Sequence, residues 1–398
     1  REDLTFEVYN LYPDYVFPGK IRRVDIRVTG APEEDKTVWI EVELHALDKV
    51  LEGAARVYMR LVSDLGTYKD VFLYPNGVFQ GEPDTVLSGG FTLSKFAKAG
   101  YWFPLQAQIR DPAGNERFER GDDFGWSLYV NNPLEDVTPP RYVRNSASLT
   151  KSVETRENRE IQVIRASWQV DEDKGMRDHI PCYASLNDEL LDTYRFEEHG
   201  DYDSQSGSCQ VLFLMPHYMP SSVYRMNFIR MTDLALNQSG VFFGDPGHLL
   251  RLEETFVDET ARQIELATDN PDTEAPELDL NAIQISAEPT NPDAPNGETS
   301  VTLTFRIRDN IAGFTQAYLH LRDPQGIEHG FWVQTRNWHN LFPSGDPSQW
   351  TTHTWTVVLP PGSAPGTWGL ADMTVWDRAE NFRQYDFTEI IHFEVERD

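Results

Sequence analysis

The stretch that decides the fold is RDPAGN, Arg110–Asn115, which follows the alternating run YWFPLQAQI. Pro after Asp, and then Gly-Asn, are residues that favour tight or left-handed turns. The same Asp-x-Ala-x-Asn pattern recurs in MTDLALN and in VWDRAEN, each time after an alternating run that contains aromatic residues. Its paired ends, which we expect to build turns, are Asp111 and Asn115, Asp233 and Asn237, and Asp377 and Asn381.

The repeated unit is longer than the turn. Leu93–Asn115 aligns without a gap on Leu359–Asn381, and Leu214–Asn237 fits with a shift of one residue. Short acidic segments that end in Pro, DVTPPRY (Asp136–Tyr142) and DTEAPEL (Asp272–Leu278), precede new alternating runs and are typical of domain boundaries. The sequence therefore predicts three domains, residues 1–136, 137–272 and 273–398.

Within each third the hydrophobic period is two. Ile161–Val170 and Val301–Asp309 alternate and are rich in Val, Ile, Thr and Phe, which is typical of strands. Leu250–Leu266 is ambiguous, and either a short helix or an edge strand fits it. Strands separated by frequent turn signals favour an all-β protein with an antiparallel β-sandwich in each third.

The motif also resembles a known family. A Gly-x-Trp/Tyr strand that ends in Asp-x-Ala-Gly-Asn is similar to the penultimate hairpin of bacterial immunoglobulin-like domains, and Gly100–Asn115 carries the full form. Leu236 and Glu380 replace the Gly in the other two copies. Thr138–Pro140 and Glu274–Pro276 resemble the starts of tandem copies in that family. The resemblance implies three tandem immunoglobulin-like domains of a secreted or surface protein.

Charge and cysteine content narrow the functional classes. The net charge of −29 opposes binding to nucleic acids and to anionic membranes. No apolar stretch approaches the ~20 residues that span a bilayer, so we expect no membrane insertion. The chain begins at Arg1, so a signal peptide would lie outside it, and we expect an extracellular, cell-surface or periplasmic location. Cys182 and Cys209 are either one disulfide or two buried thiols.

Tryptophan marks a candidate ligand site in the last third. Trp338 and Trp350 lie in a long polar segment, where exposed aromatic rings could stack on sugars. Nearby polar groups could bind hydroxyls; they are Arg336, His339, Asp346 and Gln349. The alternative is that both tryptophans close the end of the sandwich as a small satellite core.

Acidic clusters are candidate calcium ligands, because Ca²⁺ binds oxygen atoms. The candidates are Asp171, Asp173, Asp201 and Asp203, and none matches the EF-hand spacing. Calcium near domain joints, which related immunoglobulin-like tandems sometimes hold, would instead involve Asp136, Asp272 and the Asp-x-Ala-x-Asn turns. The alternative is a solvated acidic surface, which this net charge predicts in any case.

Catalytic motifs are missing from the sequence: it contains no GxSxG, no HExxH and no phosphate-binding glycine loop. We therefore expect a non-catalytic extracellular or periplasmic array that acts in binding or adhesion or as a semi-rigid spacer, with a glycan or a cell-surface protein as partner. The alternatives are a carbohydrate-binding protein, or the accessory region of a secreted polysaccharide-processing enzyme, with the Trp-rich third as sugar reader. An unrecognised β-sandwich hydrolase or lyase is a further hypothesis.

Overall fold

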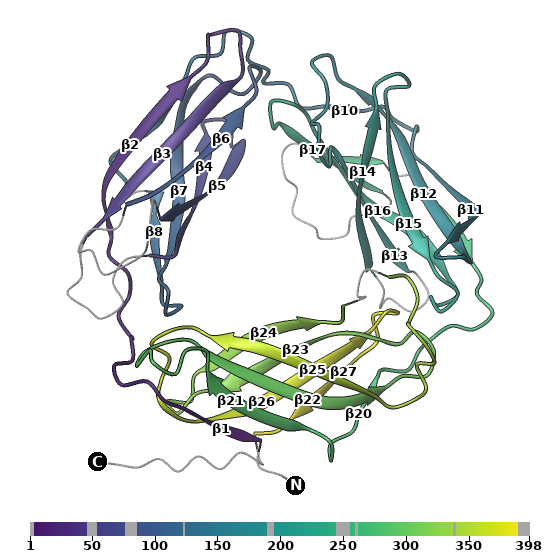
Figure 1. Cartoon of the computed structure of the whole chain (residues 1–398). Helices are drawn as coiled ribbons and strands as arrows, with labels where there is room; N and C mark the ends of the chain where they lie inside the picture. The colour runs from purple at the N-terminus through teal and green to yellow at the C-terminus, as the bar shows by residue number, and fades with distance from the viewer. Residues whose placement is uncertain are drawn as a thin grey trace.

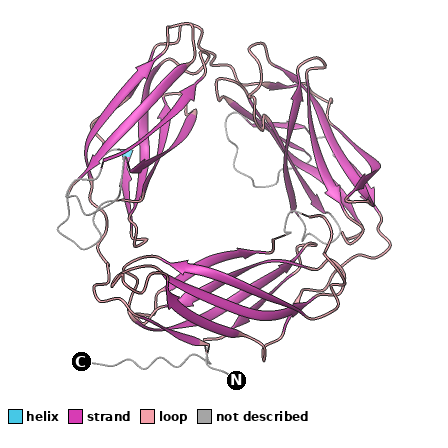
Figure 2. Ribbon diagram, in the orientation of Figure 1, coloured by secondary structure: helices cyan, strands magenta, loops and turns pink. Residues whose placement is uncertain are grey.

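The structure is a computed structural model of the whole chain, and it describes residues 4–45, 54–75, 86–121, 124–188, 195–243, 255–258, 262–336 and 340–388. In these ranges every regular element is a β-strand, and almost all strand pairs are antiparallel (Figures 1 and 2). The expected all-β class is confirmed, and the arrangement is compatible with β-sandwiches. The described residues contain no helix that is long and apolar enough to cross a membrane.

The strands fall into three groups, each around its own hydrophobic core. Group 1 is a sheet of β2 (Ile21–Thr29), β3 (Lys36–Leu44), β4 (Arg56–Ser63), β5 (Tyr68–Pro75), β6 (Val86–Leu93), β7 (Gly100–Arg110), β8 (Glu116–Arg120) and β9 (Leu128–Val130). Alternation explains its core: on β4 every second side chain, from Val57 to Ser63, is buried.

Group 2 follows in the chain. Its sheet consists of β10 (Arg141–Tyr142), β11 (Ser148–Arg156), β12 (Arg159–Asp171), β13 (Cys182–Asp188), β14 (Arg195–Asp203), β15 (Ser208–Met215), β16 (Ser222–Thr232), β17 (Gln238–Phe243), β18 (Thr255–Asp258) and β19 (Gln263–Leu266). The stretch Leu250–Leu266, for which the sequence allowed a short helix or an edge strand, contains two strands, β18 and β19, in its described part. The pairing of β17 with β18 is parallel.

Group 3 consists of two sheets that share one core. One sheet contains β20 (Glu277–Leu278), β21 (Gln284–Pro289), β22 (Thr299–Arg308) and β25 (Thr351–Leu359). The other contains β23 (Phe314–Arg322), β24 (Glu328–Gln334), β26 (Gly366–Asp377), β27 (Phe382–Asp386) and, unexpectedly, the first strand of the chain, β1 (Thr5–Val8).

The first strand thus belongs to the last group. β1 pairs antiparallel with the start of β26, where Phe6 lies opposite Trp368. The side chains of Leu4, Phe6 and Val8 are buried in the group 3 core. The expected division assigns these residues to the first third. In the structure they pair instead with residues 366–369, near the other end of the chain. As a result the three groups form a closed ring (Figure 1) rather than the extended row that a spacer suggests.

Candidate functional site

The three Asp-x-Ala-x-Asn copies form the same turn. In each copy the Asn backbone N–H donates to Oδ1 of the Asp, at 2.8 or 2.9 Å, and the Asn Nδ2 donates to Oδ2 of the same Asp, at 2.9 Å. The residue before Asn has a left-handed backbone, with φ of 91° at Gly114, 72° at Leu236 and 66° at Glu380. The turn therefore tolerates a non-glycine residue at this position in two of its copies.

Each turn also makes a contact that the sequence reasoning missed. The Asn Nδ2 donates a second hydrogen bond to the backbone carbonyl of an Asp about a hundred residues earlier: Asn115 to Asp14 (3.2 Å), Asn237 to Asp136 (3.0 Å) and Asn381 to Asp272 (3.2 Å). These three aspartates begin the segments that enter groups 1, 2 and 3. We call each such turn, with its entry aspartate, a joint.

Each entry aspartate is tied to the preceding group as well. Its backbone N–H donates at 2.8 Å to the carbonyl of Gly362, Phe96 or Tyr218, for Asp14, Asp136 and Asp272 respectively. The joint between groups 3 and 1 therefore has the same hydrogen bonds as the joints between groups 1 and 2 and between groups 2 and 3, where consecutive groups follow each other in the chain. The sequence contains a pattern that marks this third joint: Asp-x-x-x-Pro occurs at Asp14–Pro18 as well as at the two predicted boundaries.

Side chains pack across the joints. Leu236, in the group 2 turn, packs against the core of group 1. Ala312, Phe342 and Ala379, from group 3, are buried in the core of group 2. Gly114, in the group 1 turn, faces Pro360 of group 3, because a Cβ built on it would lie 3.5 Å from Pro360 Cγ. The repeated motif thus serves two structural roles, as a hairpin turn and as the contact between neighbouring groups.

Burial is the largest influence on the pKa of the Asp in each of these turns. It raises the pKa of Asp111 to about 6, of Asp233 to about 7 and of Asp377 to about 8. The hydrogen bonds from Asn115, Asn237 and Asn381 act in the opposite direction and lower these values. The protonated carboxyl is therefore favoured by the folded state at each joint.

The joint between groups 2 and 3 brings three carboxylates together. Asp272, Asp309 and Asp377 are all buried, and they offer oxygen atoms within 4.8 Å of one another. Asp309 Oδ2 accepts from the N–H of Gly313 at 2.6 Å, whereas its Oδ1 is buried without a hydrogen-bond partner. Burial, with Asp272 nearby, raises the pKa of Asp309 to about 6. Such a set has the oxygen-only chemistry of a calcium or magnesium site.

The predicted calcium ligands lie mostly elsewhere. Asp173 joins Asp136 and Glu172 in a second carboxylate cluster, at the joint between groups 1 and 2, and Asp136 Oδ2 is buried there without a partner. Asp171 ends β12, and Asp201 and Asp203 lie on β14. Asp203 accepts from Gln205 and Ser206 in its own turn. Among the described residues, the structure therefore places only one of the four in a carboxylate cluster.

The predicted sugar loop is described in part. Trp338 and His339 lie outside the described residues. Trp350 is half-buried, with the Arg308 guanidinium 4.6 Å above its ring centroid. Asp346 accepts from the N–H of Ser348 at 3.0 Å, and the Nε2 of Gln349 donates to Asp346 at 3.4 Å, which organises a local turn.

A cavity of about 530 Å³ lies beside this loop, at the end of group 3. Arg336 and Asp346 line it together with Asp309, His353 and Trp355. Burial lowers the pKa of His353, so its imidazole is neutral at neutral pH. Of the four predicted ligand residues that the structure describes, the cavity thus brings together two.

A separate aromatic surface covers the sheet of β24, β23, β26 and β27. Neighbouring ring centroids are 4.8 Å apart for Tyr318 and Trp332, 5.4 Å for Trp332 and Trp376, and 6.1 Å for Trp376 and Phe382. Trp332 and Phe382 are 60% and 63% exposed. We call Tyr318, Trp332, Trp376 and Phe382 the aromatic face.

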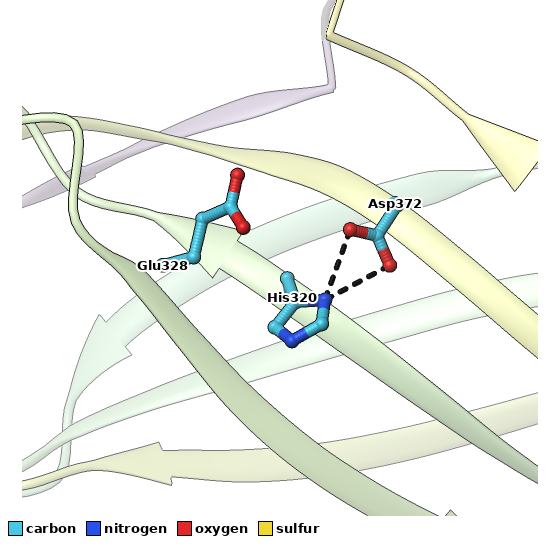
Figure 3. Close-up of side chains that lie close together, drawn as sticks. All are labelled: His320, Glu328 and Asp372. Carbon is cyan, nitrogen blue, oxygen red and sulfur yellow. Dashed lines mark hydrogen bonds and ion pairs between the residues drawn. The ribbon is translucent and has the colours of Figure 1, made fainter.

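A polar cluster adjoins the aromatic face (Figure 3). His320 on β23 contacts both carboxylate oxygens of Asp372 on β26 through Nδ1, at 2.9 and 3.0 Å, and Glu328 on β24 lies on the other side of the imidazole. The Tyr318 and His320 rings are 4.8 Å apart, so the rings and the polar cluster are continuous. Sequence periodicity showed that these strands alternate, but it did not show which side of each strand faces the core.

The two cysteines are joined. Cys182 on β13 and Cys209 on β15 form a disulfide across 27 residues, with both side chains fully buried in the group 2 core. β14 lies between these two strands in the sheet order, so the bond links strands that are not neighbours.

Comparisons with known proteins add little. No known protein family matches the chain, and no curated protein matches it. Among solved structures it is similar to the crystal structure of a leucine-rich repeat protein from Bacteroides thetaiotaomicron VPI-5482, with 12% identity over 47% of this chain and a TM-score of 0.15. The match spans 21% of that protein, and it carries no argument about fold or function.

Proposed function

We propose that the chain is a non-catalytic extracellular or periplasmic binding protein built from three immunoglobulin-like β-sandwich domains. Two features of the strand groups support this fold. In each group an aromatic residue near the start of the strand that leads into the repeated turn donates to a carbonyl four residues earlier, Trp102 to Lys98, Tyr224 to Pro220 and Trp368 to Ala364, much as in a tyrosine corner. Group 3 also packs two sheets on one core.

The three equivalent joints are the observation that carries the functional proposal. A protein whose groups are joined by buried or partly buried hydrogen bonds and by side chains packed across the joints is a rigid scaffold that holds surfaces at fixed relative positions. Such a scaffold suits recognition of a glycan or a cell-surface protein better than it suits a flexible spacer. The disulfide supports an oxidising compartment.

The test of this proposal compares binding with turnover. The purified chain is incubated with cell-surface fractions and with a panel of polysaccharides, and both retention and product release are measured. The proposal predicts retention of at least one ligand with no product. Product formation that disappears on changing a single Asp, Glu, Tyr or His would instead support the hydrolase or lyase hypothesis.

The second candidate function is carbohydrate binding by group 3, which includes the accessory region of a polysaccharide-processing enzyme. The specific observation in its favour is the aromatic face, because flat, exposed aromatic rings present large apolar surfaces beside polar groups. The cavity lined by Arg336 and Asp346 is a separate candidate for the same class of ligand.

We also propose that calcium binds at the joint between groups 2 and 3. The residues present fit it: Asp272, Asp309 and Asp377 offer only oxygen ligands, and the unpartnered Asp309 Oδ1 is a buried acceptor that a cation would satisfy. Calcium there would neutralise the three carboxylates, of which burial otherwise keeps Asp309 and Asp377 partly protonated, and it would stabilise the joint.

Thermal unfolding with calcium or with EGTA tests this site. Calcium is expected to raise the midpoint of the wild-type protein but not that of Asp309→Asn. Asp293→Asn, at an exposed Asp, is the matched control and should respond as the wild type does. An equal calcium response in Asp309→Asn would contradict the proposal.

A further inference from the structure

We propose that the aromatic face binds a neutral, extended polysaccharide, with successive sugar rings stacked on Phe382, Trp376, Trp332 and Tyr318. This inference rests on the carbohydrate-binding function proposed above, and it names both the site and the class of sugar. None of these four residues belongs to the loop that the sequence singled out.

The strand register places the aromatic residues in two neighbouring rows of the sheet. Trp376 lies opposite Phe382 and also opposite Gln316, whereas Tyr318 lies opposite Trp332. Trp332 reaches diagonally to Trp376, with their ring planes 33° apart. The four rings are therefore in continuous contact from β27 over β26 to the edge strand β24, with Tyr318 on β23 beside Trp332, and this apolar surface spans four strands, which suits a chain ligand better than a single small molecule.

Gly330 provides a second, independent observation, because it fixes the position of the Tyr318 ring. A Cβ at this position would lie 1.9 Å from the Tyr318 hydroxyl oxygen and 2.6 Å from its Cζ. The Tyr318 ring therefore lies against the backbone of β24, in a position that any larger residue at 330 would prevent. Glycine weakens a strand interior, so its presence here is explained by the close approach of this ring.

Charge selects the class of sugar. Two pairs of ionisable groups lie beside the rings, His320 with Asp372 and Arg322 with Glu328 at 2.5 Å. Asp386 adds a third carboxylate, opposite Asp372 in the β26–β27 pair. The side-chain amides of Gln316 and Gln334 also hydrogen-bond to each other across the strands, at 3.3 Å. Carboxylates therefore outnumber fixed cations here, and on a chain of net charge −29 this surface disfavours an anionic polymer and suits a neutral ligand with many hydroxyl groups.

Stacking selects the geometry of the sugar. An apolar ring face needs a flat C–H face as its partner, and hexoses whose hydroxyls are mainly equatorial offer one on each side. The planes of neighbouring aromatic rings are inclined to each other by 32° to 41°. The proposed ligand is a linear chain of such sugars, and Gln316, Gln334 and His320 offer polar groups beside the rings for its hydroxyls.

Native affinity electrophoresis in gels that contain hydroxyethylcellulose, galactomannan, xylan or, as a charged probe, polygalacturonate tests the inference. We expect the wild-type chain to be retarded by at least one neutral polymer. Trp332→Ala should weaken that binding about tenfold or more, the scale of one lost stacking contact. Gly330→Ala, which adds a methyl group that displaces Tyr318, should weaken it too.

Controls separate this inference from the function on which it rests. Phe118→Ala removes an aromatic side chain of similar exposure, 66%, from group 1 and should bind as the wild type does. Equal thermal midpoints show that each variant is folded. If Trp332→Ala and Gly330→Ala bind normally while Trp350→Ala does not, the aromatic face is wrong and carbohydrate binding stands. No retardation of the wild type by any of the four polymers overturns both, whereas retardation by polygalacturonate alone overturns only the neutral ligand.

Discussion

At the scale of single residues, the Asn that ends each repeated turn has a larger role than its sequence context suggests. Its side chain bonds to its own turn and to the entry segment of the same group, which in turn bonds to the preceding group. Local sequence was sufficient to predict the turn, because the Asp-to-Asn spacing is short and the residue types are those of turns. The distant acceptor was not predictable, because nothing local indicates which carbonyl lies a hundred residues away.

Removing the side chain of Asn237 tests whether it stabilises both its own turn and the entry segment at Asp136. Asn237→Ala removes the Nδ2 donor from the buried Asp136 carbonyl and from Asp233 Oδ2, while the backbone N–H of residue 237 still donates to Asp233 Oδ1. We expect a loss of about 2 kcal/mol in the free energy of unfolding, measured by denaturant titration. Asn131→Ala, at an exposed Asn, should stay within about 0.5 kcal/mol of the wild type. Equal stabilities for the two variants would refute the role.

The buried Asp of the first turn, Asp111, makes the free energy of unfolding depend on pH. Burial raises the pKa of Asp111 from 3.8 to about 6, so its contribution to stability is complete below the unfolded pKa and is lost as pH rises through 6. The unfolding free energy of the wild type, relative to that of Asp111→Asn, should therefore fall by on the order of 2 kcal/mol between pH 4 and pH 7. A difference that stays constant or rises with pH would contradict this cause.

At the scale of elements, most strands were predictable and β1 was not. Long alternating runs such as Val301–Asp309 identify a strand through its own period. β1 has only four residues, and its partner β26 is in the last quarter of the chain, so no local pattern assigns it there. The aromatic face shows the same limit, because alternation places Trp332 and Val333 on opposite sides of β24 without saying which side is covered.

Deleting β1 tests its assignment to group 3. Loss of residues 1–9 removes the buried side chains of Leu4, Phe6 and Val8, each of which contributes about 1.5–3 kcal/mol when buried, and exposes the edge of β26. Hydrogen exchange should become faster at residues 366–369 and remain slow in β13, and a synthetic peptide of residues 1–12 should restore protection. Unchanged exchange at residues 366–369 would place β1 elsewhere.

At the scale of the whole molecule, three repeats and three equivalent joints form a ring. In a row of three units only two joints exist; the third exists here because the N-terminal strand completes the last group and then leads into the first through Asp14. The ring places the aromatic face, the cavity and the carboxylate clusters on a scaffold whose parts are fixed relative to one another. The entry sequence at Asp14 was visible beforehand, but it could be interpreted only once the strand partner of β1 was known.

The most direct test of this account is a cross-link between the two ends of the ring. Glu7 and Thr367 are directly opposite in the β1–β26 pair. The Glu7→Cys/Thr367→Cys variant should form an intramolecular disulfide under mild oxidation, seen by mass spectrometry as a monomer without free thiols, while each single variant keeps one. Free thiols in the double variant, or disulfide-linked dimers in place of the closed monomer, would contradict the ring.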